Sequence, residues 1–137
     1  MTDEYYSLVK NDTWTELSPP KGTHVLRGKW VYALKRDEKG QITRYKARWV
    51  AKGFEQEYGV NYEQTFASVA KSMAIRILFA LAAHEDMEIN QMDAVTAFLQ
   101  SNMQDVVWVE MPVGFKKGDL ACLLKKGLYG LKQSARL

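Results

Sequence analysis

Two alternating stretches separated by a turn constrain the fold of this chain more than any other feature. Lys29–Lys35 alternates large apolar side chains with other residues, and Thr43–Lys52 alternates again after Asp-Glu-Lys-Gly at 37–40. A period of two is typical of a strand with one covered face, and Asp and Gly favour a tight turn between two such strands. The sequence therefore predicts a β-hairpin.

The second alternating stretch carries a row of cations on one face of its predicted strand. The opposite face holds Tyr45, Ala47, Trp49 and Ala51, and the cationic face holds Arg44, Lys46, Arg48, Val50 and Lys52. Like charges at alternate positions repel one another, so a triphosphate or a nucleic-acid strand lying across this face would relieve the repulsion. The alternative is a solvated outer face whose lysines discourage edge-to-edge pairing. These residues alone leave both interpretations open.

Residues 71–88 carry the clearest helical pattern. Apolar residues recur at helical spacing at Met73, Ala74, Ile77, Leu78, Leu81 and Ala82. Ile75 and Phe79 widen the stripe until it is apolar nearly all round, as expected for a helix covered on most sides. We therefore predict a core helix beneath the sheet. Short strands are expected at 88–93, 106–111 and 120–124.

Length and composition are those of one compact domain. A chain of 137 residues with 47% hydrophobic residues can build a sizeable core. Neither a membrane span nor a secretion signal is recognisable, so we expect an intracellular protein without a membrane partner. Cys122, between Leu-Ala and Leu-Leu, is expected to be a small buried side chain. His24 and His84 have no neighbour at metal-ligand spacing, which favours structural or surface roles.

The charge is distributed unevenly along the chain. Lys and Arg outnumber Asp and Glu by ten to two between Lys21 and Lys52, whereas acidic residues prevail by nine to two from Gly53 to Phe115. A basic region beside an acidic one suits a protein that neutralises phosphates with one part and holds cations with another. Ordinary solvated faces are the simpler alternative.

A lone carboxylate, Asp93, stands within Gln91–Leu99 at the end of an apolar run. On spacing alone it is either a helix N-cap or a ligand of a divalent ion, because Mg²⁺ prefers carboxylate oxygens.

Five segments together resemble the reverse transcriptase of copia-type LTR retrotransposons. They are Lys29–Val31, Tyr45–Phe54, Thr65–Val69, the Asp93 stretch and Leu128–Gln133. Five motifs in the family's order, from about Trp14 to the last residue, are far more specific than any one of them. The resemblance implies an α+β fold: a fingers β-hairpin and the partial palm of a right-hand polymerase, with antiparallel strands packed on the core helix. It divides the chain into a lead-in segment (1–20), a fingers-like hairpin with its connection (21–70) and a partial palm (71–137).

The resemblance also implies a catalytic centre. Asp93 matches the first catalytic aspartate, which binds both divalent ions, Mg²⁺ or Mn²⁺, and the backbone carbonyl of Ala94 matches a further ligand. One ion would lower the pKa of the primer 3′-hydroxyl, and the other would stabilise charge on the triphosphate. Phe98 matches the steric gate, a ring that excludes a 2′-hydroxyl by shape.

Two further groups of residues match nucleotide contacts of the family. The cations that clamp the triphosphate are matched by Lys46, Arg48 and, less closely, Lys52. The segment beside the incoming nucleotide and the template base is matched by Tyr129, Gly130, Lys132 and Ser134.

The sequence also departs from the family pattern. Asn61 stands where the family usually has Asp, Ser101 where it has Gly nearby, and Ser68 and Ala135 where it has Pro. Such departures are typical of a diverged or decaying copy. The change at Ala135 alters the local geometry expected for the template-side segment.

By this resemblance the chain is a fragment of an RNA-directed DNA polymerase from a retrotransposon polyprotein, located in virus-like particles in the cytoplasm or in the nucleus. Its implied partners are an RNA or DNA template-primer, dNTPs and the remainder of the polyprotein. The family's aromatic-x-Asp-Asp signature is missing from the sequence, which has no Asp-Asp pair. Because one carboxylate holds two ions poorly, we expect the chain to be inactive alone. The alternatives are a non-catalytic nucleic-acid-binding remnant and an unstable pseudogene product.

Overall fold

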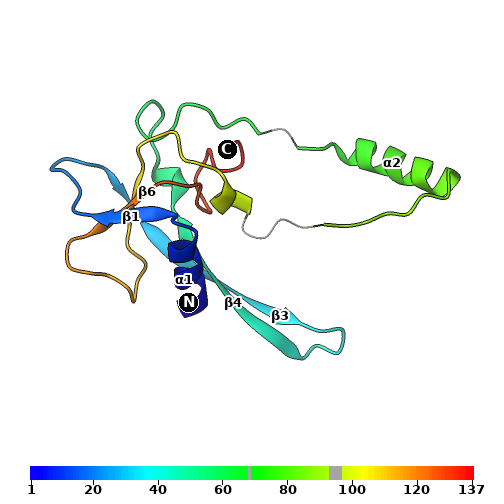
Figure 1. The fold of residues 1–137 in the computed structure, drawn as a ribbon, viewed down its shortest axis with the longest axis horizontal. Coiled ribbons are helices and arrows are strands. Elements are labelled where there is room, and N and C mark those ends of the chain that lie inside the picture. The colour runs from blue at the N-terminus through cyan, green and yellow to red at the C-terminus, as the bar shows by residue number, and fades with distance from the viewer. Residues whose placement is uncertain (68, 93–96) are drawn as a thin grey trace.

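The computed structural model describes residues 1–67, 69–92 and 97–137, drawn in colour in Figure 1. Within these residues the chain forms two α-helices, two short 3₁₀ helices and six strands, in an α+β arrangement. In chain order they are α1 (Thr2–Lys10), β1 (Trp14–Leu17), β2 (Val25–Leu26), β3 (Gly28–Arg36), β4 (Ile42–Ala51), η1 (Gly53–Glu55), α2 (Ser72–His84), η2 (Ala97–Gln100), β5 (Trp108–Glu110) and β6 (Ala121–Leu124). None of the helices in the described ranges is long and apolar enough to cross a bilayer.

The N-terminal helix α1 was not expected from the sequence. It has Asp3 and Glu4 in its first turn and Lys10 in its last, which complements the helix dipole. Tyr5 and Leu8, one helical turn apart, are its buried residues. The first twenty residues therefore contribute a helix and a strand to the packed part of the molecule.

A four-stranded sheet in the order β1-β6-β5-β2 joins the two ends of the chain. The β1–β6 and β5–β6 pairs are antiparallel, as expected, but β2 pairs with β5 in parallel, so the expectation of antiparallel strands alone was wrong. Strands β2 and β5 lie more than eighty residues apart in the sequence, and only the fold brings them into the same sheet. This sheet takes strands from all three predicted segments, and the division into those segments stays a prediction.

The predicted β-hairpin is confirmed as the antiparallel pair β3–β4. Its turn is fixed by Asp37, whose Oδ1 accepts hydrogen bonds from the backbone N–H groups of Lys39 (3.0 Å) and Gln41 (2.8 Å). At its base, Trp30 and Trp49 lie directly opposite each other, with ring centroids 5.3 Å apart. Towards the turn Tyr45 is exposed, so only the base of the hairpin has the covered face that the alternation predicts.

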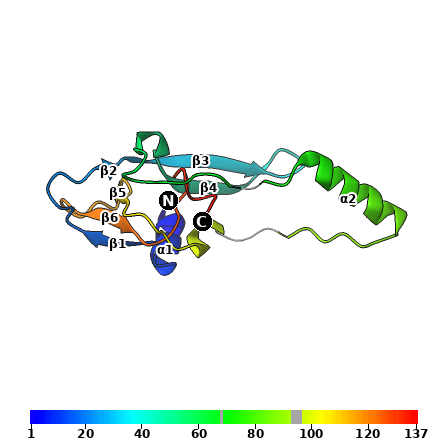
Figure 2. The same ribbon diagram turned by 90° about the horizontal axis from the view of Figure 1, so that it is seen from above.

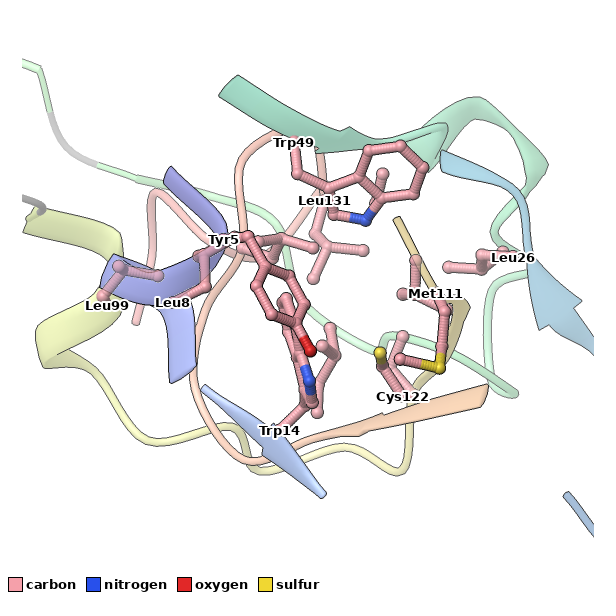
Figure 3. Packing of buried hydrophobic residues seen from close by; sticks show 14 residues of the cluster. Tyr5, Leu8, Trp14, Leu26, Trp49, Leu99, Met111, Cys122 and Leu131 are labelled. Atoms are coloured by element: carbon pink, nitrogen blue, oxygen red, sulfur yellow. The ribbon is translucent and has the colours of Figure 1, made fainter. Parts of the chain in front are cut away.

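One hydrophobic core lies between α1, the four-stranded sheet and the base of the hairpin (Figure 3). Its largest member, Trp49, is 0% exposed, and its indole Nε1 has no hydrogen-bond partner among the described residues. Cys122 is buried here too, and this burial raises the pKa of its thiol to about 12, which confirms its expected structural role. We call residues 1–62 and 97–137, which surround this core, the body.

Residues 69–92, which are called the arm, extend away from the body in both views (Figures 1 and 2). Helix α2 forms within it, but none of its residues is buried; Phe79, for example, is 55% exposed. The prediction of a core helix beneath the sheet was therefore wrong. A helix that is apolar all round needs cover on every side, and no other described element covers it.

The other predicted strands are confirmed in part. Those expected at 106–111 and 120–124 form as the shorter β5 and β6. The strand expected at 88–93 does not form over 88–92, where the backbone has no regular structure.

Candidate functional site

Three of the predicted site residues meet in one cluster. The guanidinium carbon of Arg48 lies 5.1 Å from the centre of the Tyr129 ring, within the range of a cation–π contact. The rings of Tyr129 and Phe98 meet edge to face, with centroids 5.0 Å apart and an interplanar angle of 89°. We call Arg48, Phe98 and Tyr129 the aromatic–cation cluster. Its members come from β4, η2 and the segment after β6, so only the fold brings them together.

Tyr129 is held beside β4 by an unusually close approach of two backbones. The N–H of Ala51 donates to the carbonyl of Tyr129 at 2.9 Å. A Cβ atom added to Gly130, which has a φ of +90°, would lie 2.2 Å from the oxygen of Ala51. One added to Gly53 would lie 2.0 Å from the oxygen of Gly130. Glycine is required at both positions, because any side chain would push the two segments apart.

Phe98 is positioned by η2 and by the chain that follows β6. Leu99 is buried in the core and anchors η2, while Phe98 itself is half-buried. The N–H of Gly127 donates to the carbonyl of Ser101 at 3.0 Å, and a Cβ on Gly127 would come within 2.8 Å of the oxygen of Phe98. The same C-terminal segment therefore places both aromatic rings of the cluster.

The other predicted phosphate-binding cations lie along β4 and just beyond it. Lys46 is half-buried like Arg48, and both charges act on Glu4 of α1. Burial raises the pKa of Glu4, and the positive charges of Arg48 and Lys46 oppose that rise. Lys52 follows the end of β4, where its N–H donates to the carbonyl of Arg27 at 2.8 Å.

The remaining residues predicted to lie beside the nucleotide and template make contacts within the protein. Ser134 is buried, and its hydroxyl donates to the Leu128 carbonyl at 2.7 Å and accepts from the Leu128 N–H at 3.1 Å. The ammonium of Lys132 donates to the hydroxyl of Tyr62 at 3.1 Å and lies 4.5 Å from the centre of that ring. These contacts fix the loop formed by residues 128–134. A role for Ser134 and Lys132 beside the nucleotide or the template stays a prediction.

Two glutamines, to which the sequence reasoning assigned no role, are buried next to this loop. Gln56 and Gln133 are 4% and 2% exposed, and the amide nitrogen of Gln56 donates to the amide oxygen of Gln133 at 2.9 Å. The signal available in the sequence was the position of Gln133 at the end of the last family-like segment.

The predicted metal ligands, Asp93 and Ala94, lie outside the described residues. Among those that are described, no group of three or more His, Cys, Asp or Glu side chains could hold a metal ion. Binding of Mg²⁺ or Mn²⁺ therefore stays a prediction that depends on Asp93.

The departures from the family pattern occupy different environments. Asn61 is buried, and its Oδ1 accepts from the N–H of Glu57 at 3.1 Å. Ala135 lies at a surface hollow of about 740 Å³, lined by Phe66, Ala67, Asn102, Gln104, Ala135, Arg136 and Leu137. Ser68 lies outside the described residues.

Comparisons with known proteins agree with the resemblance seen in the sequence. The family model described as reverse transcriptase (RNA-dependent DNA polymerase) matches residues 11–137. The chain is 43% identical over 139 residues to the retrovirus-related Pol polyprotein from transposon TNT 1-94 of Nicotiana tabacum, with 99% of the chain and 10% of that protein covered. The corresponding Pol polyproteins from transposons RE1 and RE2 of Arabidopsis thaliana are 40% and 39% identical, again over 99% of the chain and 10% of each relative.

The chain thus spans about a tenth of the length of these curated relatives. No solved structure matches it. A family model that matches nearly the whole chain, together with these relatives, shows that the chain belongs to the reverse transcriptase (RNA-dependent DNA polymerase) family, in the copia-type retrotransposon branch.

Proposed function

We propose that this chain supplies the nucleotide-selecting part of an RNA-directed DNA polymerase. The observation that carries the proposal is the aromatic–cation cluster, in which Arg48, Phe98 and Tyr129 meet although they are far apart in the sequence. A site for a deoxynucleoside triphosphate needs a fixed cation for the phosphates and a rigid apolar wall for the sugar. The cluster combines both.

Each member of the cluster has a distinct task in this proposal. Arg48 carries a planar guanidinium that can bind two phosphate oxygens at once. Its contact with the Tyr129 ring holds it in place before the nucleotide binds. Phe98, braced edge-on against Tyr129, excludes a 2′-hydroxyl by shape.

The other predicted groups extend the same function. Lys46 and Lys52 add positive charge towards the triphosphate. Asp93 and the carbonyl of Ala94 are the groups we expect to hold Mg²⁺ or Mn²⁺, which would neutralise charge on the triphosphate. The partners are an RNA or DNA template-primer, dNTPs and the rest of a Pol polyprotein, in virus-like particles in the cytoplasm or in the nucleus. By itself the chain, with one candidate metal carboxylate, is expected not to polymerise DNA.

The first experiment measures the affinity of the 137-residue chain for a dNTP. Arg48→Ala should weaken binding about tenfold or more, because hydrogen bonds to charged groups contribute about 1.5–3 kcal/mol each. Arg44→Ala is the matched control, since it removes the same charge from the same strand at an exposed position nearer the turn. If both variants lose the same amount of dNTP affinity, Arg48 contributes only its positive charge and not a specific contact, which would contradict the proposal.

The second experiment tests sugar selection in an active polymerase. The chain would replace the corresponding stretch in the tobacco Pol polyprotein, and the chimera would be assayed with dNTPs and ribonucleotides. Phe98→Val should raise ribonucleotide incorporation at least tenfold relative to dNTP incorporation, because it opens the wall against the sugar. If the variant still rejects ribonucleotides as strongly as the unmodified chimera, Phe98 is not the gate.

A second candidate function is nucleic-acid binding without catalysis, which the shared cationic face of β4 favours. Binding of the chain to RNA should weaken as salt concentration rises. Replacing Lys46 and Arg48 with Ala should reduce the slope of log K against log salt by about one unit per lost phosphate contact. An unchanged slope would remove this face from the binding surface.

A further inference from the structure

We infer that Gln56 is a positioning residue: its buried amide holds segment 128–134 against β4 so that Tyr129 stays beside Arg48. The inference rests on the proposed function, because it explains how the aromatic–cation cluster is kept assembled. Gln56 itself touches no member of that cluster in the described contacts. It acts through the backbone of the segment that carries Tyr129.

A continuous chain of hydrogen bonds connects Gln56 to Lys132 and Gln133 of the loop, and through Gln133 to Asn61 and Asp105. The N–H of Lys132 donates to Oε1 of Gln56 at 2.8 Å, and Nε2 of Gln56 donates to Oε1 of Gln133 at 2.9 Å. Nε2 of Gln133 in turn donates to the carbonyl of Asn61 at 2.8 Å and to Oδ2 of Asp105 at 3.0 Å. Nε2 of Gln56 also donates to the carbonyl of Asn61 at 3.4 Å, so the donors and acceptors of both buried amides are used.

The direction of every bond in this chain is fixed by groups that cannot reverse. At one end the Asn61 carbonyl and the Asp105 carboxylate only accept, so Gln133 must turn its NH₂ group towards them. Its oxygen then faces Gln56, which must present its own NH₂ group. At the other end the N–H of Lys132 only donates, which requires the oxygen of Gln56. A glutamine at position 56 satisfies both demands, and a carboxylate of the same shape does not.

The hydrogen bonds of Gln56 and the close backbone approach at Gly53 and Gly130, which we call the glycine crossing, hold the same short segment from two sides. Before the crossing, the N–H of Ala51 bonds to the carbonyl of Tyr129; after it, the N–H of Lys132 bonds to Gln56. Gln56 follows directly on η1, which begins at the crossing glycine Gly53. Losing the amide would leave buried polar groups without partners, so segment 128–134 would open locally.

The first test measures amide hydrogen exchange in the full 137-residue chain. In Gln56→Ala, the Ala51 N–H should exchange about tenfold faster or more, because a lost buried hydrogen bond costs roughly a factor of ten in a local opening equilibrium. The Leu124 N–H, which bonds to Val107 at 2.9 Å elsewhere in the body, is the internal reference and should keep its rate. Gln64→Ala, an exposed glutamine of the same connection, should change neither rate.

An isosteric variant tests the direction of the bonds. Gln56→Glu keeps the acceptor for Lys132 but places an oxygen against Oε1 of Gln133, so it should also speed exchange at Ala51. A Gln56→Glu variant with wild-type exchange would overturn the directional argument. Unchanged exchange in Gln56→Ala, or equal acceleration at Ala51 and Leu124, would show that Gln56 has no positioning role or only a general one.

Nucleotide affinity gives the functional readout. Gln56→Ala should weaken dNTP binding several-fold at a temperature where the chain stays folded. Thr13→Val serves as the control: it removes a buried hydrogen bond, from the Thr13 hydroxyl to the Leu8 carbonyl, in another part of the body. Equal weakening in both variants would overturn the inference. If the wild-type chain binds no dNTP, the proposed function fails, whereas the exchange rates still decide whether Gln56 holds the loop.

Discussion

The body and the arm are both rich in apolar residues, yet only the body buries them. In the body, residues from α1, both sheets and the C-terminal segment converge on one core (Figure 3). In the arm, α2 presents Met73, Ile77 and Leu78 to solvent, and none of its residues is buried. The spacing of apolar residues therefore indicates a helix or a strand locally. Whether that helix or strand is buried depends on other elements that cover its apolar face.

The largest expected effect comes from deleting matched aromatic side chains from the two regions. Trp49→Ala should lower the free energy of unfolding by about 3–5 kcal/mol, because it leaves a large cavity in the core. Phe79→Ala in α2 should leave that free energy nearly unchanged, since the ring is 55% exposed. Urea denaturation measures the free energy of unfolding of each variant. Circular dichroism follows the unfolding of both variants, and tryptophan fluorescence provides a second probe for Phe79→Ala, which keeps Trp49. Similar losses would mean that the arm packs as tightly as the body.

Thiol labelling sharpens the same comparison within one molecule. Cys122 is buried and its pKa is raised to about 12, so it should react with a thiol reagent only when the body unfolds. An Ala80→Cys variant adds a second thiol at an exposed position of α2. At neutral pH, Cys122 should react on the order of a thousandfold more slowly than the new thiol, as expected for a barrier of several kcal/mol. Comparable rates would contradict a closed core.

A pair of glycines tests how much the body depends on the close crossing of its backbones. Gly130→Ala and Gly59→Ala both place a side chain at positive φ, which costs about 1–2 kcal/mol. Only Gly130 also meets a backbone oxygen, whereas a Cβ at Gly59 meets nothing within 4 Å. Gly130→Ala should therefore be more destabilising by roughly a further 1–3 kcal/mol in urea denaturation. Equal costs would mean that the crossing can relax freely.

The smallest effect expected is the pH dependence of an ion pair at the edge of the body. Lys117 donates to Glu16 at 2.6 Å, and this hydrogen bond is the main reason why the pKa of Glu16 lies below its usual value of 4.5. Because the folded pKa is the lower one, the stabilisation is present above the unfolded pKa and is lost as pH falls through the folded pKa. Glu16→Gln should flatten the acid side of the stability curve, and Lys117→Met should do the same. An unchanged curve in both variants would exclude this pair as its cause.

Local patterns explain which parts of the fold could be predicted. The hairpin was predictable because its period of two and its Asp37 turn are both encoded within a few residues. Helix α2 was predicted as a helix for the same reason, but its burial was not, because burial depends on covering elements. The parallel β2–β5 pair was unpredictable, since strands of two and three residues have no measurable period. The spacing of Tyr5 and Leu8 was an available signal for α1.

Some residues of the candidate site could likewise be predicted from the sequence, and others could not. The resemblance to the family identified Arg48, Phe98 and Tyr129, and the fold then brought them together. It placed Gln133 at the end of a family-like segment but did not indicate its bond to Gln56, because a glutamine in a polar connection, such as Gln56, looks solvated until its neighbours are known. Buried polar networks are set by tertiary contacts, which residue spacing does not reveal.

The pairing of the first strand with the last also has a consequence for synthesis. Trp14 in β1 lies opposite Leu124 in β6, so the N-terminal strand has to wait for about 110 further residues to leave the ribosome. At roughly 5–20 residues per second this delay is about 5–20 seconds. During that time the Trp14 strand has an unpaired edge in the cell, open to chaperones or to a neighbouring nascent chain.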